Sequence, residues 1–425
     1  MSNPVMGFAG MTHLGLVSGI AAAEKGFNLV CYDPDIRRIN DISQCKLPVS
    51  EPQLDAILVK NRERLTFTAD ITRLQQCDVV YVAPDVATDD NGQSDLSTIN
   101  ALLDAVFDAT RPDTVIVVLS QVPPGFTRSK QRPGRALIYQ VETLIFGRAV
   151  ERALFPERYI IGCTDPSQSL PTAYAAFLNA HGCPLLPMRY ESAELAKISI
   201  NMYLVASVTT ANTLAELCEN IGADWSEIVP ALKLDRRIGQ HSYLAPGLGI
   251  AGGNLERDLA TVCDFAARLG TDAGVVRAWL ANSRHRRNWA ATTIKKVLLN
   301  ASPGATVAVW GLAYKENTHS IKNSPSLATI AQLPDTVLKF HDPEVLSSVV
   351  TNIKARGFAS ALEAAKGADA LMILTPWPEY RHILVDEICA AMRGCIVIDP
   401  YGVLNAVEAR SAGLELHVLG KPISK

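Results

Sequence analysis

Residues 5–33 read VMGFAGMTHLGLVSGIAAAEKGFNLVCYD, and this stretch decides the fold. An apolar run at 5–9 precedes a glycine-bearing turn, a predicted small-residue helix at 14–25, a second apolar strand at 29–32, and then Asp33. Strand, glycine turn, helix, strand and acid, in this order, form the pattern of a dinucleotide-binding βαβ unit. The stretch therefore predicts a parallel α/β sheet in the N-terminal part of the chain.

The turn from Gly10 to Gly15 is a GxGxxG motif in which Thr12 replaces the second glycine. The first glycine allows the tight turn and the third lets helix and strand approach, whereas the second normally lets the backbone reach a pyrophosphate. Asp33 lies 18 residues after Gly15, which suits an acceptor for ribose hydroxyls and favours NAD over NADP. Packing glycines beside a strand are the alternative, but the flanking pattern favours a dinucleotide. We assign to the cofactor Gly10, Thr12, His13, Leu14, Gly15 and Asp33.

The strand and helix alternation continues along the chain. From 192 to about 222 no glycine or proline interrupts an apolar helical pattern, which predicts one helix of about 30 residues and about 45 Å. We expect two Rossmann-like domains joined by a helical domain, with boundaries at 1–190, 191–298 and 299–425. Continuous apolar runs at 78–83 and 114–119 predict buried parallel strands. Further strands are expected at 136–141, 159–162, 306–310, 337–341, 370–374 and 395–399.

Composition excludes several classes of protein. The 425 residues carry 40 basic and 43 acidic side chains, a net charge of −3, which argues against a nucleic-acid-binding surface over the whole chain. No run approaches the roughly 18 apolar residues of a membrane helix. The nine cysteines are scattered singly without a CxxC pair, so we expect neither disulfides nor a structural metal site. A reducing cytoplasm fits this pattern best.

Several segments occur in one order along the chain. They are GMTHLG at 10–15 with Asp33, SEP at 50–52, SQVPPG at 120–125, SAELAK at 192–197 with Asn201, DRRIG at 235–239, PGLG at 246–249, GLAYK at 311–315 and NSPS at 323–326. The ordered set resembles the UDP-glucose/GDP-mannose dehydrogenase family over essentially the whole chain. The set is specific to the family, but not to one substrate.

The resemblance implies an NAD-dependent oxidation of the C6 hydroxymethyl group of a nucleotide sugar, with UDP-glucose 6-dehydrogenase as the pattern. It implies an N-terminal domain for NAD, a central domain that forms a homodimer, a C-terminal domain for the nucleotide diphosphate, and a role in polysaccharide biosynthesis. It adds Ser120 and Lys322 to the cofactor residues. It assigns to the substrate Arg237, which would reach the partner subunit's site, with Tyr243, Gly249 and Lys315.

By the same resemblance, Lys197 and Asn201 hold the C6 oxygen and Asp258 orders water and the lysine. Glu142 aligns with a glutamate proposed as a base. Lys197 and Asn201 stand four residues apart on one predicted helix, so they face the same way. Loss of hydride from an alcohol needs a proton acceptor and a cation for the developing oxyanion, which these residue types supply.

The sequence departs from the family pattern at the position of the catalytic nucleophile. Residues 246–258 read PGLGIAGGNLERD, and Asn254 stands where the family has a catalytic cysteine. An amide cannot form a thiohemiacetal or a thioester, and Cys263, nine residues on, is the nearest thiol. Three hypotheses follow: a dehydrogenase with an altered or impaired second oxidation, a non-catalytic nucleotide-sugar or NAD-binding paralogue, and an enzyme that oxidises another sugar carbon without a covalent intermediate.

Overall fold

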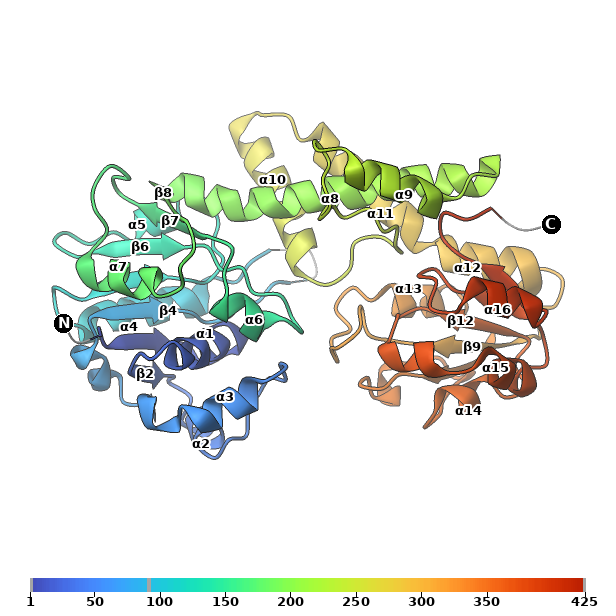
Figure 1. Cartoon of the computed structure of the whole chain (residues 1–425), viewed down its shortest axis with the longest axis horizontal. Helices are drawn as coiled ribbons and strands as arrows, with labels where there is room; N and C mark the ends of the chain where they lie inside the picture. The colour runs from blue at the N-terminus through green and yellow to red at the C-terminus, as the bar shows by residue number, and fades with distance from the viewer. Residues whose placement is uncertain (1–2, 90–92, 423–425) are drawn as a thin grey trace. The chain divides into compact units, whose positions relative to one another are not determined.

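A computed structural model describes residues 3–89 and 93–422 of the chain. The chain divides into two compact units, residues 1–200 and 201–425. Figure 1 shows the elements of both, with the first unit in blue to green and the second in green to red.

The N-terminal unit is built on an eight-stranded sheet in the order β3-β2-β1-β4-β5-β6-β7-β8. Its neighbouring strands are parallel except β6 and β7. The chain moves outward from β1 on one side and resumes at β4 on the other, which is the doubly wound arrangement. The strands are β1 (Met6–Ala9), β2 (Leu29–Tyr32), β3 (Leu65–Thr68), β4 (Val79–Val82), β5 (Val115–Val118), β6 (Leu137–Gln140), β7 (Tyr159–Cys163) and β8 (Leu185–Arg189).

Helices cover both faces of this sheet because the central strands are buried on both sides. On one face, Phe8 and Tyr81 pack in a cluster with Ile20 of the first helix; on the other, Val80 packs with Val106 of α4. The helices are α1 (His13–Glu24), α2 (Ile36–Ser43), α3 (Leu54–Lys60), α4 (Ser97–Ala109), α5 (Phe126–Ser129), α6 (Ala149–Leu154) and α7 (Thr172–Asn179), with short 3-10 segments at Arg62–Arg64 and Ile71–Gln76.

The predicted long helix is present as α8 (Tyr190–Ile221), 32 residues without a break. In the second unit it is followed by further helices and then by strands. These helices are α9 (Trp225–Leu234), α10 (Asn254–Leu269), α11 (Gly274–Arg287) and α12 (Trp289–Ile294), which runs into a π-helical turn at Lys295–Leu299.

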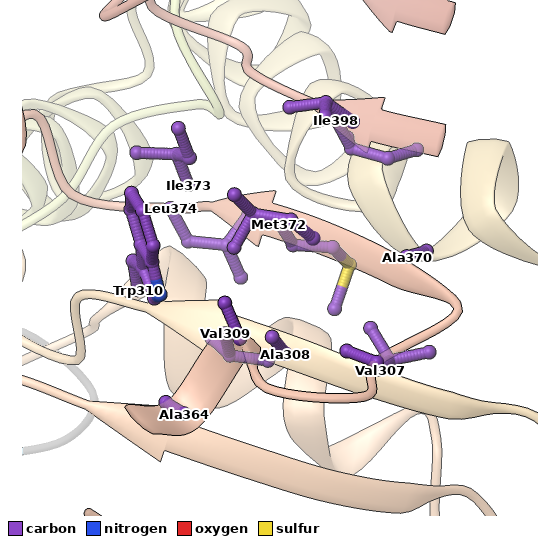
Figure 2. Packing of buried hydrophobic residues seen from close by; sticks show 14 of the residues in the cluster. Val307, Ala308, Val309, Trp310, Ala364, Ala370, Met372, Ile373, Leu374 and Ile398 are labelled. Atoms are coloured by element: carbon purple, nitrogen blue, oxygen red, sulfur yellow. The ribbon is translucent and has the colours of Figure 1, made fainter. Parts of the chain in front are cut away.

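The C-terminal sheet has six parallel strands in the order β11-β10-β9-β12-β13-β14. Figure 2 shows Val307, Val309 and Trp310 of β9 packing beside Met372 of β12 in its core. The strands are β9 (Thr306–Trp310), β10 (Val337–His341), β11 (Ala355–Gly357), β12 (Ala370–Ile373), β13 (Ile396–Ile398) and β14 (Glu415–His417). The helices are α13 (Pro325–Ala331), α14 (Ala361–Ala365), α15 (Val385–Ala391) and α16 (Ala406–Ser411), with 3-10 segments at Ser347–Val349 and Pro378–His382.

The predicted fold class is confirmed: two Rossmann-like sheets, parallel throughout except between β6 and β7, and a long helix in the central region. Among residues 3–89 and 93–422, no helix combines the length and apolar character needed to span a membrane. The same described residues contain no group of three or more His, Cys, Asp or Glu side chains placed to hold a metal ion.

Candidate active site

The glycine turn joins β1 to α1 in the N-terminal unit. Gly10 has φ +97°, a conformation that favours glycine. A Cβ on Gly15 would lie 1.9 Å from the Gly10 carbonyl oxygen, so only glycine lets the helix approach the turn this closely. The two glycines therefore have the roles that the motif predicts for them.

Asp33 lies at the end of β2, buried beside this turn. Its Oδ2 accepts a hydrogen bond from the Met11 N–H at 2.6 Å, and its Oδ1 accepts one from the Asp35 N–H at 2.9 Å. Arg38 Nη1 lies 2.9 and 2.8 Å from the two carboxylate oxygens. The carboxylate is thus fixed in place by backbone and guanidinium donors, at the point where an adenosine ribose binds in this type of fold.

The first turn of α1 has two side-chain partners from elsewhere in the unit. Asp85, which follows β4, accepts a hydrogen bond from the His13 N–H at 2.9 Å, and its own N–H donates to Thr12 Oγ1 at 2.8 Å. The His13 ring pairs through Nε2 with Glu51 at 2.9 Å and stacks on Phe146 with centroids 4.2 Å apart. The start of α1 is therefore held by two carboxylates, from Asp85 and Glu51.

Lys197 and Glu142 form an ion pair, with Nζ 2.6 Å from Oε1. Both side chains are mostly buried, with 13% and 15% of their surfaces exposed. The Glu142 Oε2 accepts a hydrogen bond from the Leu144 N–H at 3.0 Å, which orients the carboxylate. The structure thus brings together the predicted cation and the predicted base.

Glu194, one turn before Lys197 in α8, anchors this helix. Its carboxylate accepts hydrogen bonds from the backbone N–H groups of Gly125 at 2.6 Å and Thr127 at 2.8 Å. Burial raises the pKa of Glu194, although these hydrogen bonds oppose the rise. Because Gly125 is the last residue of the SQVPPG segment at 120–125, Glu194 fixes the Lys197 end of α8 against the segment that contains Ser120. Ser120 is buried and donates through Oγ to the Pro84 carbonyl oxygen at 2.5 Å.

In the second unit, Asn201 donates through Nδ2 to Asp258 Oδ2 at 2.5 Å. Arg257 Nε lies 3.5 Å from Asp258 Oδ1, and all three side chains are buried. Asn201 lies one turn after Lys197 in α8, so both side chains leave the same face of the helix. The predicted Asn201 and Asp258 are therefore in direct contact.

The loop that leads to Asn254 is clamped by its neighbours within the second unit. Gly249 has φ +79°, and a Cβ there would lie 2.4 Å from the Ser283 carbonyl oxygen. The Gly252 N–H donates to the Lys322 carbonyl oxygen at 3.1 Å. Asn254 then begins α10 with an exposed side chain. Gly249 is thus required by close packing, and the predicted Lys322 lies beside this loop.

Cys263 lies within α10, nine residues after Asn254. At 100° per residue, nine residues place it on the opposite side of the helix. It packs against the apolar cluster of Val205, Leu259 and Val276. The structure therefore gives this thiol no place on the Asn254 face.

The C-terminal sheet repeats the turn of the N-terminal one. Gly311 has φ +93° after β9, and Asp342 at the end of β10 accepts hydrogen bonds from the Leu312 and Ala313 N–H groups at 2.6 and 3.0 Å. The predicted Lys315 follows, with Nζ 5.7 Å from the centre of the Tyr314 ring. A Cβ on Gly252 would lie 3.1 Å from that ring, so the turn and the loop before Asn254 are neighbours.

A cavity of about 770 Å³ also lies in the second unit. Trp225, Tyr243 and Tyr401 supply aromatic surface, and Lys233 and Lys421 supply positive charge. Its aromatic and cationic lining suits an anionic aromatic ligand. The predicted Tyr243 lies in this wall with half of its surface exposed, whereas Arg237 is exposed and paired with Asp235 at 2.7 Å.

The sequence matches the models of one known protein family. Three models of the UDP-glucose/GDP-mannose dehydrogenase family match the chain: the NAD binding domain over residues 5–178, the central domain over 191–284 and the UDP binding domain over 308–406. The chain belongs to this family. NAD is accordingly the cofactor of its N-terminal domain.

Relatives match over nearly their full length. UDP-glucose 6-dehydrogenase TuaD of Bacillus subtilis is 28% identical, covering 97% of this chain and 92% of its own. UDP-glucose 6-dehydrogenase of Pseudomonas aeruginosa is also 28% identical, covering 97% and 96%. Among solved structures, a UDP-glucose dehydrogenase of Pyrobaculum islandicum superposes with a TM-score of 0.84 at 24% identity over 97% of both chains. That likeness supports the fold.

The residues of the N-terminal unit fit the adenosine ribose of NAD, but side chains crowd the place of the NAD pyrophosphate. Asp33 and Arg38 supply the groups for ribose hydroxyls. At the start of α1, where a dinucleotide places its pyrophosphate, Thr12 adds a side chain and Asp85 a carboxylate. When bound, NAD supplies the hydride acceptor.

Several residues of this arrangement were not predicted from the sequence. Arg38 could have been found from its position five residues after Asp33 on the next helix. Glu51 lies in one of the segments that carry the family resemblance, but nothing in the sequence indicates that it pairs with His13. Asp85 lies 72 residues from His13 along the chain and no motif indicates their contact.

Proposed function

We propose that this protein is an NAD-dependent nucleotide-sugar dehydrogenase that oxidises a sugar hydroxyl in the manner of UDP-glucose 6-dehydrogenase. The observation that carries the proposal is the buried Lys197–Glu142 ion pair at 2.6 Å. A carboxylate can take the hydroxyl proton, and the adjacent ammonium can stabilise the oxyanion that develops as hydride leaves. A UDP-sugar is the expected substrate, because the UDP binding domain of the family is present.

The first oxidation needs no thiol. Glu142 would take the hydroxyl proton and bound NAD would accept the hydride, so that the alcohol would become an aldehyde and NAD would become NADH. Asn201, one helical turn after Lys197 in α8, and its partner Asp258 of α10 would hold the same oxygen or a water.

The second oxidation is altered because Asn254 replaces the thiol. Without a thiohemiacetal, the aldehyde must first add water, and the hydrate then loses a hydride to a second NAD and a proton to give the acid. The exposed amide of Asn254 and the position of Cys263 on the far side of α10 support this route. The same position of Asn254 and Cys263 also supports a two-electron oxidation at another sugar carbon, because that reaction needs no covalent adduct.

The assignment of parts follows the family models. Residues 1–190 would bind NAD, 191–298 would form a dimer, and 299–425 would bind the nucleotide diphosphate, with Lys315, Gly249 and Tyr243 at the substrate. Arg237 has 89% of its side chain exposed, which leaves it available to a neighbouring subunit. The pattern of single cysteines supports a cytoplasmic location.

A panel of nucleotide sugars incubated with NAD tests the proposal. We expect NADH with at least one UDP-sugar, and loss of at least a hundredfold in kcat for Lys197→Ala, because its charge is needed wherever an alkoxide develops. Lys354→Ala is the matched lysine control, because Lys354 is 45% exposed beside Asp335, outside the residues assigned to the cofactor and the substrate. Clear binding of a UDP-sugar with no NADH from any member of the panel would support the non-catalytic paralogue instead.

A further inference from the structure

The contacts at the start of α1 form a reciprocal pair between the glycine turn and the segment after β4. Asp85 accepts from the His13 N–H at 2.9 Å and donates its own N–H to Thr12 Oγ1 at 2.8 Å. Glycine at position 12 would have no hydroxyl to accept this second bond. Thr12 and Asp85 are therefore two halves of one contact.

This contact occupies the place of an anion. The first N–H groups of a helix have no partner within the helix, and the positive end of the helix dipole favours negative charge there. In the βαβ fold, that anion is the pyrophosphate of the dinucleotide. Here the N–H of His13, the first residue of the 12-residue α1, already binds a carboxylate.

A carboxylate and a phosphate cannot share this N–H. The two anions would lie within a few ångström of each other, where like charges repel strongly. The neighbouring Met11 N–H is also taken, by Asp33 at 2.6 Å. Dinucleotide binding therefore requires the Asp85 carboxylate to leave the helix.

We infer that Asp85, latched by Thr12, is an internal competitor of the NAD pyrophosphate and sets the affinity of this domain for its cofactor. With no cofactor bound, the Asp85 carboxylate caps α1. On binding, the pyrophosphate takes the His13 N–H, and the Asp85–Thr12 contact opens. The inference concerns the cofactor alone and does not depend on which sugar is oxidised.

Equilibrium titration of the full chain with NAD, and separately with ADP as a pyrophosphate probe, tests this inference. We expect Asp85→Ala and Asp85→Asn to lower the Kd for both ligands at least tenfold. Asp165→Asn is the matched control, because Asp165 is another exposed carboxylate that accepts from a backbone N–H, that of Ser167 at 3.0 Å. An unchanged or higher Kd in both Asp85 variants would overturn the inference.

Two substitutions at Thr12 separate the latch from simple crowding. Thr12→Val keeps the bulk but removes the hydroxyl, whereas Thr12→Ser keeps the hydroxyl. We expect Thr12→Val to tighten NAD binding, Thr12→Ser to leave it nearly unchanged, and Thr12→Val with Asp85→Ala to give less than the sum of the single effects. Additive effects, or tighter binding with Thr12→Ser only, would show that the two residues do not act as one contact.

The rise in melting temperature on adding NAD is a readout that a purely structural role of Asp85 would not increase. Without ligand, Asp85→Ala should melt at a lower temperature, because α1 loses its cap. The rise in Tm on adding NAD should nevertheless be larger than in the wild type. A smaller rise contradicts the inference. Absence of sugar oxidation would refute the proposed function but leave this result unaffected.

Discussion

At the scale of single residues, the chain has the side chains that we propose move a proton and stabilise an oxyanion, and it has Asn254 where the resemblance places a thiol. Lys197 pairs with Glu142, and Asn201 pairs with Asp258, at 2.6 and 2.5 Å. None of these buried polar contacts is needed for an apolar core, and an apolar replacement costs little in such places. The presence of these pairs in a chain that also has Asn254 is therefore more readily explained by chemistry than by folding.

A cysteine at position 254 tests the proposal that Asn254 alters the second oxidation. In Asn254→Cys we expect the second NADH per sugar to form faster, because a thiolate can hold the aldehyde as a thiohemiacetal. The measurement is the ratio of the two phases of NADH formation. Cys263→Ser is the control and should change neither phase, since this side chain packs on the other side of α10.

We assign the selectivity for NAD over NADP to Asp33. Its carboxylate should accept ribose hydroxyls and repel a 2′-phosphate, so we expect NAD to bind at least tenfold more tightly than NADP. In Asp33→Ser the ratio should fall, because Arg38 loses the carboxylate that now holds it and becomes available to a phosphate. Equal Kd values for the two cofactors in the wild type would contradict this assignment.

At the scale of elements, sequence patterns predicted the buried parts well. Continuous apolar runs marked β1, β4, β5, β9 and β12, and the uninterrupted helical pattern marked α8. The strands that escaped prediction, β3, β8, β11 and β14, all lie toward the edges of the sheets. They lack a continuous apolar run because they are partly exposed; β8 even contains Pro187, which an edge strand tolerates.

The residues of the candidate site also divide into those that the sequence predicted and those that it did not. The sequence spacing placed Lys197 and Asn201 on one face of a helix, and the family resemblance supplied Asp258 and Glu142. The partners Asp85 and Glu51 could not be predicted, because each meets His13 through tertiary folding of a distant segment. Local sequence determines elements, whereas these contacts depend on where the elements pack.

Asp399, in the turn after β13, makes the stability of the protein depend on pH. Burial raises the pKa of Asp399 to about 6, from an ordinary value of 3.8, although backbone N–H groups including that of Leu404 oppose the rise. Asp399 ionises at a lower pH in the unfolded chain than in the folded one, so the folded state binds more protons between about pH 4 and about pH 6. The free energy of unfolding therefore falls by up to about 3 kcal/mol as pH rises through this range.

The Asn substitution at this turn gives the measurement. Asp399→Asn keeps the acceptor for the Leu404 N–H but does not titrate. We expect it to unfold at higher urea concentration than the wild type at pH 7, and to lose that advantage near pH 4.5. Asp335→Asn, whose side chain is 96% exposed, should show no such trend. A parallel pH dependence in Asp399→Asn and wild type would contradict the assignment.

At the scale of the whole molecule, α8 and α9 expose apolar surface that a single chain leaves in water. The residues concerned are Tyr203, Leu214, Leu217, Ile221, Ile228 and Leu234, with exposed fractions from 38% to 80%. Exposed apolar side chains mark protein–protein contacts where they join into one surface. This supports the proposed homodimer built on the central helices.

Sedimentation measures the assembly. We expect a dimer at micromolar concentration, and a shift toward monomer in Leu217→Glu, which would bury a charge at the contact. Leu346→Glu is the control, because Leu346 is 76% exposed but lies in the C-terminal domain outside these helices. A wild-type protein that sediments only as a monomer would contradict the proposal.

The central claim is that a nucleotide sugar is oxidised here without a covalent intermediate. Rapid quenching during turnover, with intact-protein mass spectrometry and NADH absorbance on the same samples, tests it most directly. The account predicts NADH at one per sugar, or at two with a slow second phase, while the protein mass stays that of the unmodified chain at every time point. An adduct of sugar mass on the wild-type chain, at Cys263 or elsewhere, would contradict it.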